Sequence, residues 1–272
     1  MMAGMPLNVH NVDMVEGVQG AQVVHRLAGV LRTVSAAMPH GIATSDVART
    51  AALPRPTAHR LLASLAAEGF LDHDRRSGRW LLGPELYLMG SVAAERYDIS
   101  PLAREHVRAL AEATGESAFF SVRRGNETVC LLREDGAFPI RSFVLHEGKR
   151  FPLGVASAGL AILAFLPEKA VEQYLATTDL TADYSDSHGP DAIRSRVRDT
   201  RALGYAVNPG LIVSGSWGMG AAVFDPSGQP AWALSLTGIA PRFADERRPE
   251  LGRLLLHHAH ELSRKLRPTP AR

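Results

Sequence analysis

The stretch that most constrains the fold is a short amphipathic segment with a cationic entrance, ALPRPTAHRLLASLAAEGFL at residues 52–71. Its apolar side chains recur at helical spacing and predict one buried face, made of Ala58, Leu61, Leu62 and Leu65. The first acidic residue of the segment, Glu68, comes only in its last turn, and Gly69 is placed to end the helix. We therefore expect a helix that is held by an apolar stripe and exposes a polar, basic N-terminal half.

Two predicted helices precede this segment and a predicted hairpin follows it. Apolar residues over 22–36 follow helical spacing, and SDVARTAAL at 45–53 predicts a brief second helix with Thr44 or Ser45 as its N-cap. From Gly69, the stretch GFLDHDRRSGRWLLGP places apolar residues on either side of a turn, which predicts a β-hairpin. Three short helices and a hairpin in this order are typical of a winged helix-turn-helix.

In a helix-turn-helix, the second helix of the pair places its N-terminal half in the major groove of duplex DNA. The span from Arg49 to Arg79 holds six arginines against three acids, a local basic bias. Arginine is suited to guanine edges, and hydroxyls are suited to phosphate oxygens. The alternative, a solvated helix face beside a charged hairpin, is disfavoured by the framing elements. The predicted contacts with operator DNA are Thr44, Ser45, Arg55, Pro56, Thr57, His59, Arg60, Ser64, Arg75, Arg76 and Arg79.

The remainder of the chain predicts a second domain of a different class. A helix over 84–98 would link the two, and from Pro101 strands meet through short turns while helices gather elsewhere, which indicates an antiparallel α+β sheet domain. The predicted strands are 117–124 and 127–134 around the turn at Gly125, then 139–145, 204–208, 218–224 and 231–238. The predicted helices are 102–114, 157–166, 168–176, 190–203 and 242–266. The expected organisation is a disordered tail (1–19), a winged helix-turn-helix (20–83), a linker helix (84–98) and the α+β domain (99–268).

Composition excludes several classes of protein. The single cysteine, Cys130, rules out an internal disulfide framework and fits a reducing compartment. No run approaches the roughly 18 consecutive apolar residues that a membrane span needs. We therefore expect a cytoplasmic protein that does not insert into a membrane.

Three blocks of the sequence resemble the IclR family of bacterial transcriptional regulators. They are TSDVARTAALPRPTAHRLLASLAAEGFL with SGRWLLGP, then HEGKRFPLGVASAGLAILAFLPEKAVE, then RALGYAVNPGLIVSGSWGMGAAVFDPSGQPAWALSLTG. The likeness extends over nearly the whole chain, from about residue 20 to 267. It implies a C-terminal, GAF-like effector-binding domain that senses a small organic molecule.

The resemblance also implies the residues of the effector pocket: Ser157, Ala158, Asn208, Gly218, Ser235 and Thr237, flanked by Trp217 and Met219. The residue types agree with this role. Amides at a helix N-terminus favour a carboxylate or carbonyl oxygen, and the hydroxyls of Ser235 and Thr237, two residues apart on one strand, would face the same side of the sheet. The sequence departs from the family pattern at Asn208, where some members carry an acid, and at Gly218, where cysteine is frequent.

Enzyme motifs are weaker than the regulator pattern. GVASAG at 154–159 approaches the G-x-S-x-G nucleophile elbow but has one residue too many before the serine. His257, His260 and Glu261 have a spacing compatible with a metal, but near a chain end they are more often surface residues. Two other function classes stay open, a hydrolase-like enzyme that uses the C-terminal cavity and a ligand-binding module without DNA recognition.

The sequence therefore predicts a non-enzymatic DNA-binding regulator without a cofactor or metal. Its operator affinity is controlled by a small organic effector, such as a carboxylate, an aromatic acid or a related carbonyl compound. The chain is expected to act as a homodimer, or a tetramer, on a palindromic site in duplex DNA.

Overall fold

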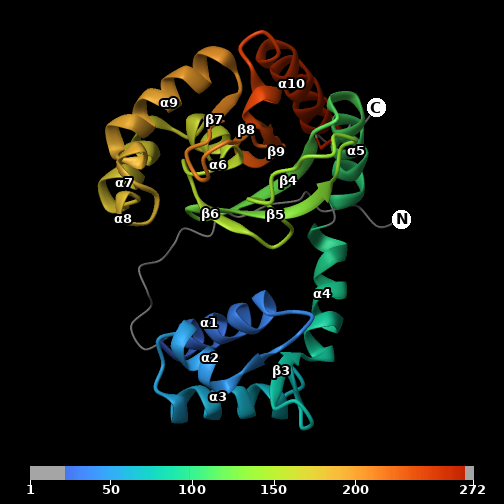
Figure 1. Ribbon diagram of the computed structural model, residues 1–272, viewed down its shortest axis with the longest axis vertical. Helices are drawn as coiled ribbons and strands as arrows, with labels where there is room; N and C mark the ends of the chain where they lie inside the picture. The colour runs from blue at the N-terminus through green and yellow to red at the C-terminus, as the bar shows by residue number, and fades with distance from the viewer. Residues whose placement is uncertain (1–21, 98, 267–272) are drawn as a thin grey trace. The chain divides into compact units, whose positions relative to one another are not determined.

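The computed structural model describes residues 22–97 and 99–266, and the chain divides between residues 98 and 99 into two compact units (Figure 1). The predicted disordered tail, residues 1–19, lies outside the described residues. The first unit extends through the helix predicted as a linker. Its elements are α1 (Gln22–Ala36), β1 (Ile42–Ala43), α2 (Thr44–Thr50), α3 (Arg55–Ala67), β2 (Leu71–Asp74), β3 (Arg79–Leu82) and α4 (Pro84–Tyr97).

The first unit has the helix and hairpin order that the sequence predicts. Its three strands form an antiparallel sheet in the order β1-β3-β2, in which β1 was not predicted. Helix α3 ends in a Schellman motif, because Gly69 adopts φ +75° and the amides of Gly69 and Phe70 donate to the carbonyls of Ala66 and Leu65. The buried core joins all three N-terminal helices to the hairpin through Val30, Val34, Val47, Leu62, Leu65, Leu71 and Trp80.

Trp80 connects the hairpin to α2. Its ring is buried and stacks on His73 with the ring centroids 4.3 Å apart, and its Nε1 donates to Thr44 Oγ1 at 2.9 Å. The predicted N-cap at Thr44 or Ser45 is wrong, since the cap position of α2 is Ala43 and no side chain caps it. The hydroxyl of Thr44 is used by the tryptophan instead.

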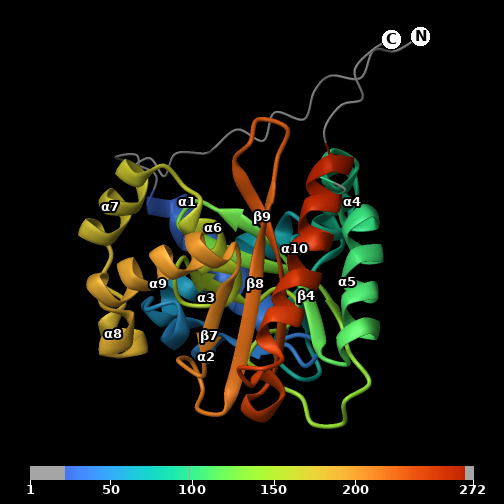
Figure 2. The ribbon, with the colours of Figure 1, turned by 90° about the horizontal axis from the view of Figure 1, so that it is seen from above.

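The second unit places one six-stranded antiparallel sheet between two helical layers, in the strand order β6-β5-β4-β9-β8-β7 (Figures 1 and 2). Helix α6 packs on one face of β8 and β9, whereas α5 and α10 pack on the opposite face. Its elements are α5 (Ser100–Thr114), β4 (Ser117–Arg124), β5 (Glu127–Glu134), β6 (Arg150–Pro152), α6 (Ser157–Ala164), α7 (Glu168–Thr177), α8 (Thr181–Tyr184), η1 (Asp186–His188), α9 (Pro190–Leu203), β7 (Ala206–Pro209), β8 (Ser216–Phe224), β9 (Pro230–Ile239), η2 (Ala240–Phe243) and α10 (Arg248–Lys265).

Strand alternation divides the sheet into a face toward α6 and a face toward α5 and α10. On β8, Gly220 approaches α6 and Ala222 belongs to the core beneath that helix. Met219, Ala221 and Val223 belong to the core on the other face. The small residues on the α6 side leave room for the helix to lie directly on the strand.

Two predicted elements differ from the structure. Residues 139–145 are not a strand, because β6 takes the edge of β5 and Pro139 cannot donate to a ladder. The last helix begins at Arg248 rather than at Arg242, where the short η2 helix lies instead. Arg242 is held there by the buried carboxylate of Glu116, just before β4, which accepts from Arg242 Nε and Arg247 Nη1, each at 2.7 Å.

A histidine pair, buried at His106 and half-buried at His258, joins α5 to α10. The Nδ1 atoms of His106 and His258 lie 3.1 Å apart, so one ring must donate a proton to the other. Burial lowers the pKa of both rings, and the neighbouring charges of Lys265, Glu105, Glu261 and His257 act on them more weakly. Both imidazoles are therefore favoured in the neutral form in the folded protein.

Two negative findings apply to the described residues. No helix in 22–97 or 99–266 is long and apolar enough to cross a membrane. Within the same residues, no group of three or more His, Cys, Asp or Glu side chains is placed to hold a metal ion.

The histidine pair makes stability depend on pH. Because the folded pKa values lie below the value of about 6.5 for unfolded histidine, the pair stabilises the fold above that pH and the contribution is lost as the pH falls. We expect the denaturation midpoint to drop between pH 7.5 and 5.5 less steeply in the variant His106→Gln, His258→Gln than in the unmodified chain. Replacing the exposed His260 with Gln is the control, and equal slopes in all three proteins would contradict the assignment.

Candidate functional site

Helix α3 presents the basic face that the sequence predicts. Ala58, Leu62 and Leu65 are buried, whereas the polar side chains at the helix entrance are exposed. In the described part of the chain, neither Arg55 nor Arg60 forms a hydrogen bond or an ion pair. The helix begins after Pro54 with no side-chain cap. Pro56 has no amide hydrogen, and the amides of Thr57 and Ala58 both donate to the Pro54 carbonyl. The two exposed guanidinium groups lie at the N-terminal, positive end of the helix dipole, and together they form a surface that favours anions.

The wing is a tight hairpin with a fixed tip. Asp74 accepts from the backbone amide of Arg76 at 2.9 Å and from Ser77 Oγ at 2.5 Å. The hydrogen bond from Ser77 lowers the pKa of the Asp74 carboxyl, which stays ionised at neutral pH. Arg75 and Arg76 are exposed at this tip. Arg79 is exposed too, but its Nη1 donates to the Gly41 carbonyl at 2.8 Å and thereby fixes β1 beside β3.

The remaining predicted DNA contacts surround α3. Pro56, His59 and Ser64 are exposed on the helix, and Thr57 is half-buried in its first turn. At the start of α2, Ser45 is exposed, but the Thr44 hydroxyl already accepts from Trp80. The structure thus leaves most of the predicted residues accessible, and their contact with DNA stays a prediction.

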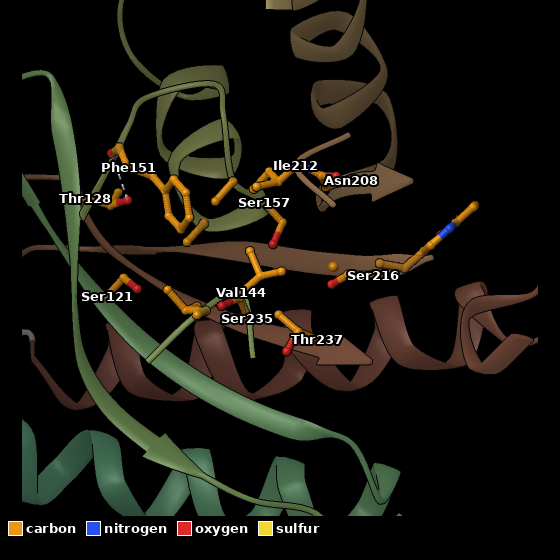
Figure 3. A pocket seen from close by; sticks show the side chains of 15 residues that line it. Ser121, Thr128, Val144, Phe151, Ser157, Asn208, Ile212, Ser216, Ser235 and Thr237 are labelled. Carbon is orange, nitrogen blue, oxygen red and sulfur yellow. Dashed lines mark hydrogen bonds between the residues drawn. The ribbon is translucent and has the colours of Figure 1, made fainter. Parts of the chain in front are cut away.

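The second unit holds a cavity between the first turn of α6 and the sheet (Figure 3). The cavity is lined by Ser121, Thr128, Val144, Leu145, Phe151, Ala156, Ser157, Ala158, Asn208, Ile212, Ser216, Trp217, Gly218, Ser235 and Thr237. Seven of the eight residues predicted for the effector pocket are among these fifteen. The exception is Met219, which is fully buried in the core on the opposite face of the sheet.

The polar wall of the cavity is the N-terminus of α6. Ser157 is the first helical residue, and Ala156 before it provides no side-chain cap. The first amides of a helix have no intrahelical partner, so those of Ser157 and Ala158 are available to an oxygen atom in the cavity. Gly220 permits this arrangement, because a Cβ there would lie 2.9 Å from the Ser157 carbonyl carbon and oxygen.

Two hydroxyls on β9 face this helix end without a partner. Ser235 is 0% exposed and Thr237 is 9% exposed, and neither side-chain oxygen has a hydrogen-bond partner. Both side chains point into the cavity (Figure 3). A buried hydroxyl without a partner costs free energy, so these groups are placed for a hydrogen bond to a bound molecule.

Asn208 lines the cavity, and both ends of its side-chain amide also have hydrogen-bond partners in the protein. Its Nδ2 donates to the Val155 carbonyl at 2.7 Å, and its Oδ1 accepts from the Leu211 amide at 3.0 Å. It therefore ties the loop before α6 to the turn between β7 and β8. An aspartate could not donate to Val155, so an amide at this position keeps the helix end in place.

Trp217 and Gly218 shape the adjoining wall. The Trp217 ring lines the cavity and lies beneath the Arg248 guanidinium, 5.4 Å from the ring centroid. A Cβ at Gly218 would come 3.1 Å from Ser157 Oγ. Glycine therefore gives the serine hydroxyl and any bound molecule more space than a larger residue would.

Sequence reasoning missed eight lining residues. Ser121 and Thr128 lie on β4 and β5, Phe151 lies on β6, and Ala156 precedes α6. Val144 and Leu145 come from the segment predicted as a strand, and Ile212 and Ser216 from the turn before and the start of β8. Ser142 holds the segment of Val144 and Leu145 to the start of β8, because its Oγ lies 2.5 Å from Ser216 Oγ. Ser121, a serine within the apolar run AFFSV at 118–122, was the one sequence signal for the part of the lining that β4 contributes.

The chemistry of the cavity suits binding. Of the described residues that line it, none carries a carboxylate, an imidazole, an amine or a guanidinium. Ser157 has no acid or base beside it among those lining residues, so the serine lacks the partner that nucleophilic catalysis needs. Burial raises the pKa of the Cys130 thiol to about 12, which makes it a poor nucleophile.

Comparison with known families assigns both units. The family described as "Bacterial transcriptional regulator IclR C-terminal" matches residues 91–264, and the one described as "IclR helix-turn-helix domain" matches residues 23–75.

Individual relatives belong to the same family. The HTH-type transcriptional regulator KipR of Bacillus subtilis (strain 168) is 28% identical over 223 residues, which cover 82% of this chain and 88% of KipR. The crystal structure of Thermotoga maritima IclR is 26% identical with a TM-score of 0.66, covering 90% of this chain and 98% of that one. An IclR homologue from Microbacterium hydrocarbonoxydans, crystallised with 4-hydroxybenzoate, shares the fold with a TM-score of 0.72 at 23% identity, covering 89% and 98% of the two chains.

The C-terminal family match alone spans more than half of the chain, and the helix-turn-helix match covers the elements from α1 into the wing. The order of the two matches is the order of the two compact units. The chain belongs to the IclR family of bacterial transcriptional regulators, with the family's helix-turn-helix followed by its C-terminal domain.

Proposed function

We propose that this chain is a cytoplasmic transcriptional regulator that binds operator DNA through α3 and the wing, under the control of a small organic effector bound beside α6. The observation that carries the DNA-binding role is the pair of exposed arginines, Arg55 and Arg60, without partners at the uncapped entrance of α3. A helix entrance of this kind matches the demands of the major groove and its flanking phosphates. Arg75 and Arg76 would contact the backbone or minor groove beside it.

Arg60 tests the readout of the operator. We expect Arg60→Ala to weaken binding by about 1–3 kcal/mol if the guanidinium contacts a guanine edge. The operator is first selected from randomised duplex DNA with the full chain, and affinities are then measured by fluorescence anisotropy at fixed salt concentration. Arg253→Ala, which removes an exposed arginine from α10, is the control. Unchanged affinity in Arg60→Ala removes this residue from the readout, and failure to select any sequence favours a binding module without DNA recognition.

The effector is a small organic carboxylate, an aromatic acid or a related carbonyl compound. The amides of Ser157 and Ala158 and the hydroxyls of Ser235 and Thr237 converge on one end of the cavity, and an oxygen-rich group there would satisfy all of them. The Microbacterium homologue that was crystallised with 4-hydroxybenzoate supports this class.

The two hydroxyls provide a test of this site. We expect Ser235→Ala with Thr237→Ala to weaken effector binding by roughly 1–3 kcal/mol, because two hydrogen bonds to the bound oxygen are lost. Small carboxylates, aromatic acids and amides, with 4-hydroxybenzoate among the first, are screened by thermal shift, and hits are quantified by calorimetry. The exposed Ser195→Ala on α9 is the control. If the double variant retained full stabilisation, the effector would bind elsewhere.

The protein acts as a homodimer, or a tetramer, on a palindromic operator. Among the α4 side chains that the structure describes, four large apolar ones are more than half exposed, namely Tyr87, Leu88, Met89 and Val92. Exposed apolar patches of this kind mark interaction surfaces, and a two-fold dimer buries the same patch from both copies. A dimer would also match two half-sites of the operator.

The α4 patch can be tested by hydrodynamics. We expect Tyr87→Ser with Val92→Ser to raise the dimer dissociation constant by at least about tenfold, because two large apolar side chains are lost from the interface. Sedimentation velocity over a concentration series measures it. Leu203→Ser, which changes another exposed apolar residue, is the control. An unchanged constant would exclude α4 from the interface.

Coupling between effector and operator follows from linkage. An effector that binds one arrangement of the dimer more tightly shifts the population toward it, by no more than its differential affinity for the two arrangements. The effector changes operator affinity by the same factor by which the operator changes effector affinity.

A further inference from the structure

The cavity continues past the helix end along the floor of the sheet. On β9, Ala233, Ser235 and Thr237 alternate onto the α6 face, and Ser121 of β4 lies directly opposite Ala233. Four residues of antiparallel strand span about 13 Å, so this floor is longer than a carboxylate group alone requires. Thr237 and Ser235 mark one end of this floor, and Ala233 beside Ser121 of β4 marks the other.

The far end carries a second set of hydroxyls. Ser121 and Thr128 line the cavity there and are 1% and 4% exposed. Thr128 Oγ1 makes only a long contact of 3.4 Å with the Phe151 carbonyl, and Ser121 neighbours the Cys130 thiol across the strands. Figure 3 places both hydroxyls at the opposite end of the cavity from Asn208 and Ser216. Each hydroxyl has hydrogen-bonding capacity left for a bound molecule.

The two polar ends are separated by apolar side chains. Phe151, Val144, Leu145 and Ile212 supply apolar lining of the cavity, and Figure 3 shows Val144 between Ser121 and Ser216. A molecule with a hydrocarbon centre would bury that surface favourably, whereas a polar centre would lose its hydration without compensation.

Charge limits what the far end accepts. No lining residue within the described chain carries a formal charge, and only the α6 end offers uncapped helix amides for an anion. A second carboxylate or an ammonium group at the Ser121 end would be buried without a partner of opposite charge, at a large cost in free energy. A hydroxyl or carbonyl group there needs only the hydrogen bonds that Ser121 and Thr128 supply.

We infer that Ser121 and Thr128 form a distal subsite, and that the effector is an elongated monocarboxylate with a neutral hydroxyl or carbonyl group at its opposite end. This inference rests on the proposed function, which places the carboxylate at α6. The free volume for water-sized molecules is about 30 Å³, so the effector enters by displacing Val144 and Leu145 outward. These residues lie on a segment without regular structure, fastened to β8 by Ser142 and Ser216.

Matched ligands of equal length test the inference on the full-length protein. Calorimetry compares straight-chain acids of about four to ten carbons with their ω-hydroxy, ω-amino and dicarboxylate counterparts. We expect one ω-hydroxy acid of intermediate length to bind about 2- to 12-fold more tightly than its parent acid, as one added hydrogen bond allows. The dicarboxylate and the amino acid of that length should bind more weakly than the parent.

Variants locate the preference. Ser121→Ala and Thr128→Val should each reduce the ω-hydroxyl advantage, and together abolish it, while affinity for the short parent acids stays unchanged. Ser195→Ala is the control, and circular dichroism checks each fold. The ligand comparison uses the unmodified chain, so it tests the inference even if a variant folds poorly.

Several outcomes would overturn it. The distal subsite is excluded if dicarboxylates or amino acids bind as tightly as ω-hydroxy acids, or if the ω-hydroxyl advantage survives in the Ser121→Ala, Thr128→Val variant. The proposed carboxylate site at α6 still stands in that case, provided that Ser235→Ala with Thr237→Ala weakens binding of the short acids. Failure of every acid to bind overturns both this inference and the proposed effector class. Operator binding by α3 is measured separately and is unaffected by either result.

Discussion

The second unit depends on one close contact, the packing of the first turn of α6 against β8. A Cβ at Gly220 would lie 2.9 Å from the Ser157 carbonyl carbon and oxygen, a distance that real Cβ atoms do not adopt against backbone. Glycine therefore lets the helix lie on the strand, and this brings the uncapped amides of Ser157 and Ala158 over the hydroxyls of Ser235 and Thr237. Asn208 keeps the approach fixed by bonding the Val155 carbonyl just before the helix. Without this contact the helix amides would not line the cavity.

Local patterns let the sequence predict the first unit well. The period of α3, the left-handed residue Gly69 and the turn of the wing are each encoded within a few residues, and all three predictions agree with the structure. The antiparallel sheet of the second unit was predictable for the same reason. The N-cap of α2 was not, because the Thr44 hydroxyl is claimed by Trp80, 36 residues away in the chain.

The cavity was predictable only in part, because its walls come from distant segments. Family likeness supplied the residues at α6, β8 and β9, but strand alternation already excluded one of them. If Gly218 faces the cavity, its neighbour Met219 in the middle of β8 must face the opposite core, as it does. The loop from 139 to 145 could not be placed, since its apolar pattern resembles a strand, whereas β6 pairs with β5 at that edge of the sheet and Pro139 cannot donate to a ladder.

The two proposed binding surfaces differ in charge and therefore in how each binds its partner. The surface of α3 and the wing is exposed and cationic, so its affinity for DNA gains from phosphate contacts and falls with salt. The cavity is buried and has no formal charge on its described lining, so its selectivity comes from hydrogen bonds and shape. An effector can then shift the protein between states only through the groups that it moves or satisfies. In this cavity those are the partnerless hydroxyls of Ser235 and Thr237 and the segment that Ser142 fastens to Ser216.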